Sequence, residues 1–169
     1  MSSSLLDAAF AHNVWATLRA IDPCLDLSTE ELRTTSSARG AIIETLRHIV
    51  ADDANDLFIL TGDPTFDVEV EGTSLPEPGV AMERIGAGWS WFISRPIDPE
   101  AMVREVDEID GYERTAPVAF RLAQALHHGT DHRSQICTAL TTLGVEPPAV
   151  DVMSCGLDVN RIMEKLPGG

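Results

Sequence analysis

Basic residues and long apolar runs are both scarce in this sequence, and each absence excludes a class of protein. The chain has 12 Lys and Arg against 27 Asp and Glu in 169 residues, so its formal net charge at pH 7 is −15. A protein of that charge repels a phosphate backbone, and we expect no nucleic-acid partner. The longest apolar runs fall far short of the ~18 residues of a membrane-spanning helix, so we expect no membrane partner.

Cysteine is also scarce, and a targeting segment is not evident. Cys24, Cys137 and Cys155 are an odd number at wide spacings and form no C-x-x-C pair that would suggest a redox or zinc-ribbon site, which fits a reduced compartment. We expect each of them to be a small buried apolar residue. The opening MSSSLLDAAF lacks the positive charge with which a signal peptide begins, so we expect a cytoplasmic protein.

Glycine-rich functional motifs are missing as well. The sequence contains no G-x-G-x-x-G, no phosphate-binding loop and no G-x-S-x-G. These absences exclude the common dinucleotide-binding turn and the nucleophile elbow of serine hydrolases. Any chemistry must therefore come from other residue types.

Composition and apolar spacing predict a helical bundle. Hydrophobic residues make up 44% of the chain and charged residues 23%, which is typical of one globular domain, and we expect residues 1–169 to form it. Apolar residues recur at every third or fourth position in four long segments, at about 5–20, 38–60, 78–95 and 117–143. A short last helix is expected near 157–166. The predicted fold class is all-α, a four-helix bundle with a short C-terminal helix and small irregular or hairpin-like links.

The links between these helices carry weaker signals. Ser28 and Glu31 form a capping-box pattern, which predicts a short turn of helix. Apolar and acidic residues alternate over 66–71, but so short a run predicts an extended connector and not a sheet. The link after the third long helix contains Asp110-Gly111, which favours a hairpin, with a short helix as the alternative.

Three of the five histidines, His127, His128 and His132, lie within one six-residue stretch of the last long predicted helix. His128 and His132 are four residues apart, which places their Cβ atoms ~6 Å apart on one helix face, a separation at which two imidazoles can share a metal ion. They lie at the edge of the apolar stripe, so we expect them to face the core. His127 is turned by about 100° and should be solvated. The pair is either a hydrogen-bonded pair or part of a metal site, and a metal site needs a third ligand.

His48 is the candidate third ligand from another helix, although its helical position is unfavourable. It lies nearly opposite the apolar stripe, so the line Thr45, His48, Asp52 is either a solvated face or the border of a wet cleft. In the second case Asp52, or Asp53 beside it, could orient the imidazole or bind metal. His12 is expected to be a pocket-wall or surface residue.

Four segments of the chain carry more specific motifs. LHHGTDHRSQI at 126–136 contains H-G-T-x-H-R-x-Q, and TLRHI at 45–49 contains L-x-H-I. HNVWA at 12–16 and the G-x-x-P-P-x-x-D run at 144–151 complete the set. Together they resemble the DinB-like and YfiT-like metalloenzymes, a family of four-helix bundles that hold a metal ion with three histidines.

This resemblance implies that His48, His128 and His132 are the ligands of a divalent ion. Three imidazoles suit Zn, Ni and Fe alike. The sequence departs from the family pattern at Asp131, where many relatives have His, and at Ser134, where Gly is common. Neither position is a ligand in that pattern, and Asp131 adds a carboxylate near the site.

Three neutral imidazoles leave an open coordination position, as in catalytic sites. The resemblance implies a transferase or isomerase that adds a low-molecular-weight thiol, such as mycothiol or bacillithiol, to an electrophilic small-molecule substrate. A first alternative is a metal-dependent hydrolase in which Asp52 or Asp131 is the general base for a water molecule. A second is a stress-related metal- or ligand-binding protein without turnover.

We also expect a homodimer. Relatives of this kind commonly pair their bundles. In addition, Trp89, Trp91 and Phe92 offer more aromatic surface than one helix face can bury.

Overall fold

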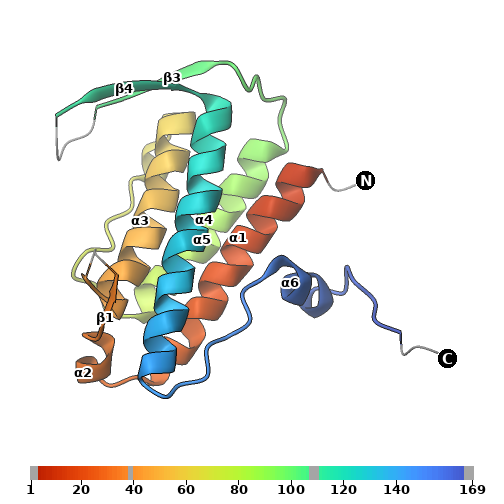
Figure 1. Ribbon diagram of the computed structural model, residues 1–169. Helices are drawn as coiled ribbons and strands as arrows, with labels where there is room; N and C mark the ends of the chain where they lie inside the picture. The colour runs from red at the N-terminus through yellow and green to blue at the C-terminus, as the bar shows by residue number, and fades with distance from the viewer. Residues whose placement is uncertain (1–3, 38–39, 107–110, 166–169) are drawn as a thin grey trace.

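Four long helices lie side by side and form the body of the protein (Figure 1). The computed structural model describes residues 4–37, 40–106 and 111–165. The long helices are α1 (Leu5–Ile21), α3 (Ile42–Thr61), α4 (Pro76–Ile93) and α5 (Val118–Thr142). Short elements link them: η1 (Asp22–Asp26), α2 (Thr29–Leu32), β1 (Thr35–Ser37), β2 (Gly40–Ala41), η2 (Pro64–Phe66), β3 (Met102–Val106), β4 (Glu113–Pro117) and α6 (Val152–Asp158). The predicted all-α four-helix bundle is confirmed.

Each long helix packs against two neighbours. The contacts run from α1 to α4, from α4 to α3, from α3 to α5 and from α5 back to α1, so α1 and α3 face each other across the diagonal of the bundle. None of the described helices is long and apolar enough to cross a lipid bilayer.

The ends of the long helices follow local signals. Ser4 caps α1 through a capping box with Asp7, and Ser28 caps the short α2 in the same way with Glu31. Gly62 ends α3 in the left-handed region, with φ of 67°, a conformation that glycine adopts without strain. Prolines mark two further starts: Pro76, expected to precede the third long helix, is the first residue of α4, and Pro117, expected in the first turn of the fourth, is the N-cap residue of α5.

Two predicted boundaries are wrong. The helix expected from 38 begins at Ile42, because the short strand pair β1–β2 precedes it; Ala38 itself lies outside the described residues. The last helix, expected near 157–166, covers 152–158 instead. Leu166, at the end of the expected range, lies outside the described residues. The overlooked signal is Asp151, whose Oδ1 accepts hydrogen bonds from two backbone amides of the first turn at 2.9 and 3.0 Å.

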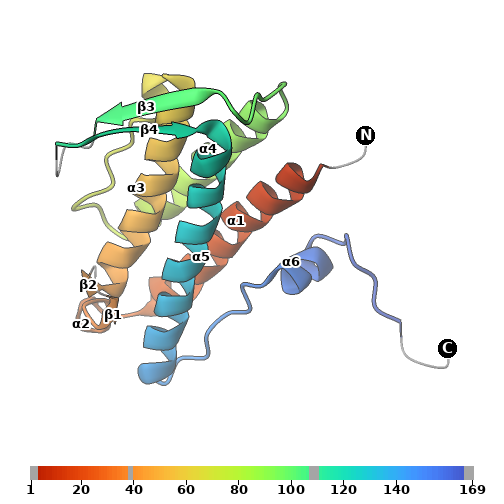
Figure 2. The same cartoon turned by 45° about the horizontal axis from the view of Figure 1, so that its top comes forward.

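The other links agree with the predictions. Segment 66–72 is a connector without a strand, and its Phe66 and Val70 side chains are buried. Strands β3 and β4 form an antiparallel hairpin, in register from Met102 opposite Pro117 to Val106 opposite Glu113. The hairpin lies across the ends of α3 and α5 (Figure 2). Residues 107–110, and with them the role expected for Asp110, lie outside the described residues.

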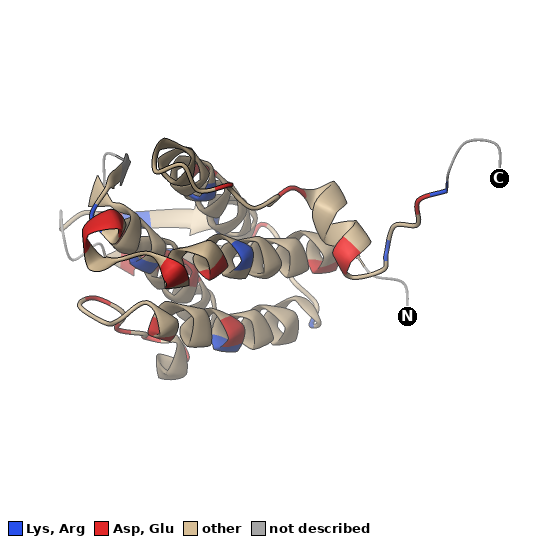
Figure 3. Cartoon of the chain, turned by 90° about the horizontal axis from the view of Figure 1, so that it is seen from below, with Lys and Arg blue, Asp and Glu red and all other residues tan. Residues whose placement is uncertain are grey.

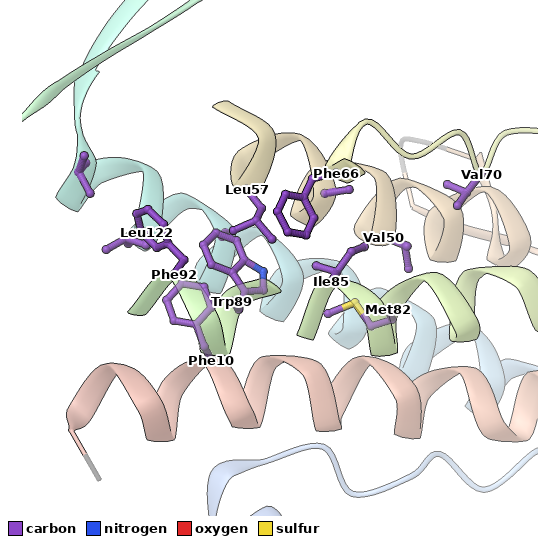
Figure 4. Close-up of a cluster of buried hydrophobic side chains, with 13 residues drawn as sticks. Phe10, Val50, Leu57, Phe66, Val70, Met82, Ile85, Trp89, Phe92 and Leu122 are labelled. Carbon is purple, nitrogen blue, oxygen red and sulfur yellow. The ribbon is translucent and has the colours of Figure 1, made fainter. Parts of the chain in front are cut away.

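The apolar core fills the space between the helices (Figure 4). Two glycines of α4 permit its close packing. A Cβ atom on Gly86 would lie 2.9 Å from Cγ1 of Val14, and one on Gly88 would lie 2.5 Å from Cδ2 of Leu57 and Cε1 of Phe66. Glycine weakens a helix interior. Here its small size lets α4 approach both α1 and α3.

The aromatic residues of α4 belong mostly to this core. Trp89 is fully buried and Phe92 nearly so, whereas Trp91 is about half exposed and carries the Arg95 guanidinium 3.6 Å from its ring centroid. Two of the three side chains that motivated the homodimer are thus covered within one chain. The homodimer stays a prediction.

A buried polar network connects all four long helices. Arg133 of α5 donates a hydrogen bond from Nη1 to Oδ1 of Asn13 on α1 at 2.8 Å. Asn13 donates from Nδ2 to Oδ2 of Asp53 on α3 at 2.9 Å, and Trp89 of α4 donates from Nε1 to the other oxygen at 3.1 Å. All four side chains are at most 3% exposed. Burial raises the pKa of Asp53 to about 7, although the hydrogen bond from Asn13 and the charge of Arg133 both act to lower it.

Gly129 makes room for this network. A Cβ atom there would lie 2.7 Å from Nη1 of Arg133 and 2.8 Å from Oδ1 of Asn13. These atoms cannot move apart without breaking a buried hydrogen bond, whose loss leaves polar groups without partners.

We therefore expect Gly129→Ala to destabilise the protein by about 1–3 kcal/mol, because the cost of the displaced network exceeds the ~1 kcal/mol that alanine contributes to a helix. Gly79→Ala in α4 is the matched control, since nothing lies within 4 Å of its Cβ position. That variant should be as stable as the parent or up to ~1 kcal/mol more stable. Urea denaturation measures both; equal gains in the two variants would contradict the prediction.

A second buried carboxylate attaches the hairpin to the bundle. Arg121 of α5 forms an ion pair with Glu105 of β3 and lies 3.5 Å from Oδ1 of Asp56 on α3. Burial raises the pKa of Asp56 from 3.8 to about 7, against the attraction of Arg121. Below that pKa the folded protein keeps a proton that the unfolded chain has already released. This carboxyl group therefore lowers the stability as the pH rises from about 4 to about 7.

Asp56→Asn removes that titration and keeps an oxygen that can accept from Arg121. We expect the stability of the variant, measured relative to the parent, to increase between about pH 5 and about pH 8. Urea denaturation at the two pH values, with metal removed, isolates the effect because the remaining titrating groups are common to both proteins. A stability difference that does not change with pH would show that Asp56 is ionised throughout.

Candidate metal centre

The three histidines named by the sequence come together between α3 and α5, the pair of adjacent helices seen in Figure 1. Nε2 of His128 lies 3.0 Å from Nε2 of His48 and 3.1 Å from Nε2 of His132. One nitrogen from each of the three rings lies within 4.8 Å of the other two. The four-residue spacing on α5 supplies two rings, and helix packing supplies the third.

Two of the rings are oriented by oxygen atoms on their far side. Nδ1 of His132 lies 2.7 Å from Oε1 of Gln135, and Nδ1 of His48 lies 3.3 Å from Oδ1 of Asp52. An oxygen acceptor keeps the proton of a neutral imidazole on Nδ1 and leaves a lone pair on Nε2. The Nε2 atoms of His48 and His132 are thus prepared to bind a cation.

The spacing of the nitrogens fits ligands of one ion. Two nitrogens bound at ~2.1 Å to the same metal are between about 3.0 Å apart, at a right angle, and about 3.4 Å apart, at the tetrahedral angle. The separations of 3.0 and 3.1 Å lie at the narrow end of this range. Three imidazole nitrogens are a donor set for Zn, Ni or Fe, so the group can hold a divalent metal ion.

The group is partly open on the side of α3. His132 is buried, whereas the side chains of His48 and His128 are 18% and 16% exposed and that of Asp52 is 41% exposed. Oδ2 of Asp52 lies 3.2 Å from Nε2 of His128, so this carboxylate contacts two of the three rings. A cleft of about 710 Å³ begins at His48 and Asp52 and continues between α3 and the connector.

The structure separates the remaining candidates. His127 is exposed, as predicted, and so is Asp131. Asp53 does not orient His48; it is buried in the network that joins the helices, because it is turned by about 100° from Asp52. Thr45 is fully buried and donates to the carbonyl of Ala41, so the line through His48 is solvated only in part.

His12 lines a different cavity. Its Nε2 lies 2.9 Å from the carbonyl oxygen of Val150, at a cavity of about 640 Å³ between α1, α5 and the C-terminal segment. Of the two positions expected for His12, a pocket wall or the surface, the structure shows the first. Cys137 lines the same cavity and is half buried, whereas Cys24 and Cys155 are buried as expected.

The sequence reasoning missed two features of the site. Gln135 orients His132, and its signal was the spacing of three residues on one helix. The other is the network partner of Arg133, Asn13, which no local pattern could reveal because it lies 120 residues away.

Comparison with known proteins assigns the family. The profile of the DinB family matches residues 1–156, so the chain belongs to the DinB family. Comparison with curated proteins and with solved structures gives no match.

We expect His48→Ala to weaken divalent-metal binding by about tenfold or more, because it removes one of three ligands. Its effect on the stability of the metal-free protein should be small, since the side chain is 18% exposed. His127→Ala is the control, being exposed and adjacent to His128. Calorimetric titration of metal-free protein with Zn and with Ni measures the affinities.

Elemental analysis of protein purified without a metal-affinity step complements the titration. It should find about one ion per chain in the parent and a large loss in His128→Ala and in His132→Ala. Indistinguishable titrations of the His48 and His127 variants would contradict the assignment of the third ligand.

Proposed function

We propose that this DinB-family protein is an enzyme that holds one divalent ion with His48, His128 and His132 and activates a low-molecular-weight thiol. The thiol is transferred to an electrophilic small molecule, or adds to it during an isomerisation. The observation that carries the proposal is the meeting of three imidazole nitrogens, one of which belongs to His48 at the wall of an open cleft. A thiol such as mycothiol or bacillithiol is the co-substrate that the sequence resemblance suggests.

His48, His128 and His132 would hold the ion, which would supply an open coordination position and lower the pKa of a thiol bound beside them. Asp52 supplies the base, because its Oδ2 lies beside Nε2 of His128 and its side chain is accessible from the cleft. The thiol proton passes to this oxygen. The sulfur then attacks an electrophilic carbon with its electron pair, and a leaving group departs with the pair of the broken bond.

Other residues keep the reacting groups in place. Gln135 and Asp52 hold the rings of His132 and His48 through their Nδ1 atoms, which fixes the direction of each Nε2. Phe58 and Val68 line the cleft and provide an apolar surface for the substrate.

A metal-dependent hydrolase is the second candidate function, and the Asp52 carboxylate is the feature that favours it. Asp52 is 41% exposed, so a water molecule can reach it as readily as a thiol can. Asp131 is the other base that the sequence offers. Asp52 is preferred over it, because Asp52 contacts two of the histidines.

We expect metal-loaded protein to accelerate the reaction of a low-molecular-weight thiol with an electrophile such as monobromobimane. A chelator should abolish the acceleration, and so should His132→Ala, whereas His127→Ala should keep it. Fluorescence of the thioether product gives the rate, and the hydrolysis of a nitrophenyl ester without thiol is followed in parallel. Metal-dependent ester hydrolysis alone would favour the hydrolase, and metal binding without either reaction would favour a binding protein.

A further inference from the structure

The cleft that begins at His48, one of the three candidate ligands, has one helical wall and one extended wall. His48 and Asp52 lie on the α3 wall, and connector 66–72 forms the opposite wall. Its volume of about 710 Å³ is typical of sites for small molecules. A ligand that reaches the histidines from this side therefore rests its remaining part between α3 and the connector.

Charged residues of the lining are almost all acidic. The lining holds one basic side chain, Arg47, and five acidic ones, which gives 1 − 5 = −4; the acidic residues are Glu44, Asp52, Asp67, Glu69 and Glu71. The first two lie on α3: Glu44 accepts from the backbone amide of Ala41, and Asp52 lies against the histidines. Among the remaining carboxylates, Oε1 of Glu69 accepts from the backbone amide of Glu71 at 2.9 Å.

The other three carboxylates belong to the connector, where the sequence alternates. Phe66 and Val70 point into the core and are buried, so Asp67, Glu69 and Glu71 point outward and are exposed at the cleft. Arg47 donates a hydrogen bond to the carbonyl of Thr73, the residue that follows the connector. The connector wall therefore presents three negative charges to whatever lies in the cleft.

Resting on the thiol activity proposed above, we infer that this cleft selects its thiol by charge. It prefers a thiol whose remaining part carries an ammonium group, binds an uncharged thiol less tightly and binds a thiol that carries a carboxylate least tightly. The sulfur itself binds at the histidines, where the ion compensates its charge. Asp67, Glu69 and Glu71 act on the rest of the molecule and determine the specificity.

The expected effect is moderate and depends on salt. One pair of unit charges ~7 Å apart in water changes an affinity roughly threefold. Three carboxylates should therefore separate the ammonium and carboxylate ligands by at least about tenfold at low ionic strength. The difference should shrink in ~0.5 M salt, where screening acts over only a few ångströms.

Three thiols of equal length serve as probes: aminohexanethiol, mercaptohexanol and mercaptohexanoate. Their long spacers keep the terminal group from binding the metal together with the sulfur. Protein loaded with Co is titrated with each thiol, and the sulfur-to-metal charge-transfer absorption gives the dissociation constant without reference to turnover. We expect the affinities to decrease in the order amine, alcohol, acid.

The net charge of the whole protein must be separated from the charge of the cleft, because acidic residues occur on many elements (Figure 3). The cleft variant carries Asp67→Asn, Glu69→Gln and Glu71→Gln. The control carries Glu30→Gln, Glu83→Gln and Glu146→Gln, which are exposed positions outside the cleft lining. Both variants change the net charge by the same amount.

The three possible outcomes are distinct. A preference for the amine that is lost in the cleft variant and kept in the control supports the inference. Equal affinities for the three thiols, or affinities in the reverse order, overturn the inference of charge selection. A preference for the amine that both variants lose also overturns it. Neither result contradicts the proposed thiol activity. Absence of a charge-transfer band with all three thiols overturns the proposed function, and this inference with it.

Discussion

The buried hydrogen-bond network between Arg133, Asn13, Asp53 and Trp89 is the constraint on which the arrangement of the bundle depends. Charged groups in a protein interior are costly unless every one is paired and hydrogen-bonded. Asn13 meets this requirement by accepting from the guanidinium with its oxygen and donating to the carboxylate with its nitrogen. The four side chains come from four helices, so the network is satisfied only when the helices have the correct offset along the bundle.

The same offset aligns the candidate metal centre. Arg133 follows His132 directly on α5, and Asp53 follows Asp52 on α3. Successive residues of a helix point about 100° apart, so when Arg133 and Asp53 point to the middle of the bundle, their neighbours point into the α3–α5 interface. The network thereby holds in register the two helices that carry the histidines. The cleft next to them lies on the outer side of α3, where the connector can bring its own charges to the site.

Local signals were sufficient for much of the architecture. Apolar spacing, prolines at helix starts and glycines at helix ends predicted the four helices, because these determinants act within a few residues of one another. The two wrong helix boundaries lie where several short-range signals favour different starting residues. The last helix was placed too late because the capping by Asp151 was overlooked, and the start of α3 was placed too early because a pair of short strands precedes it.

The sequence by itself determined the helices, the acidic balance and the pair His128 and His132, since all of these depend on composition or on spacing along one helix. His48 was assigned to that pair by family resemblance and not by spacing. Only the tertiary structure decided how its ring meets the other two, that Asp52 contacts the rings while Asp53 is buried, and that the connector faces the cleft. Apolar periodicity places His48 on a polar face but does not say what lies opposite that face. The answer depends on which helices become neighbours, and this is decided by packing between residues far apart in the chain.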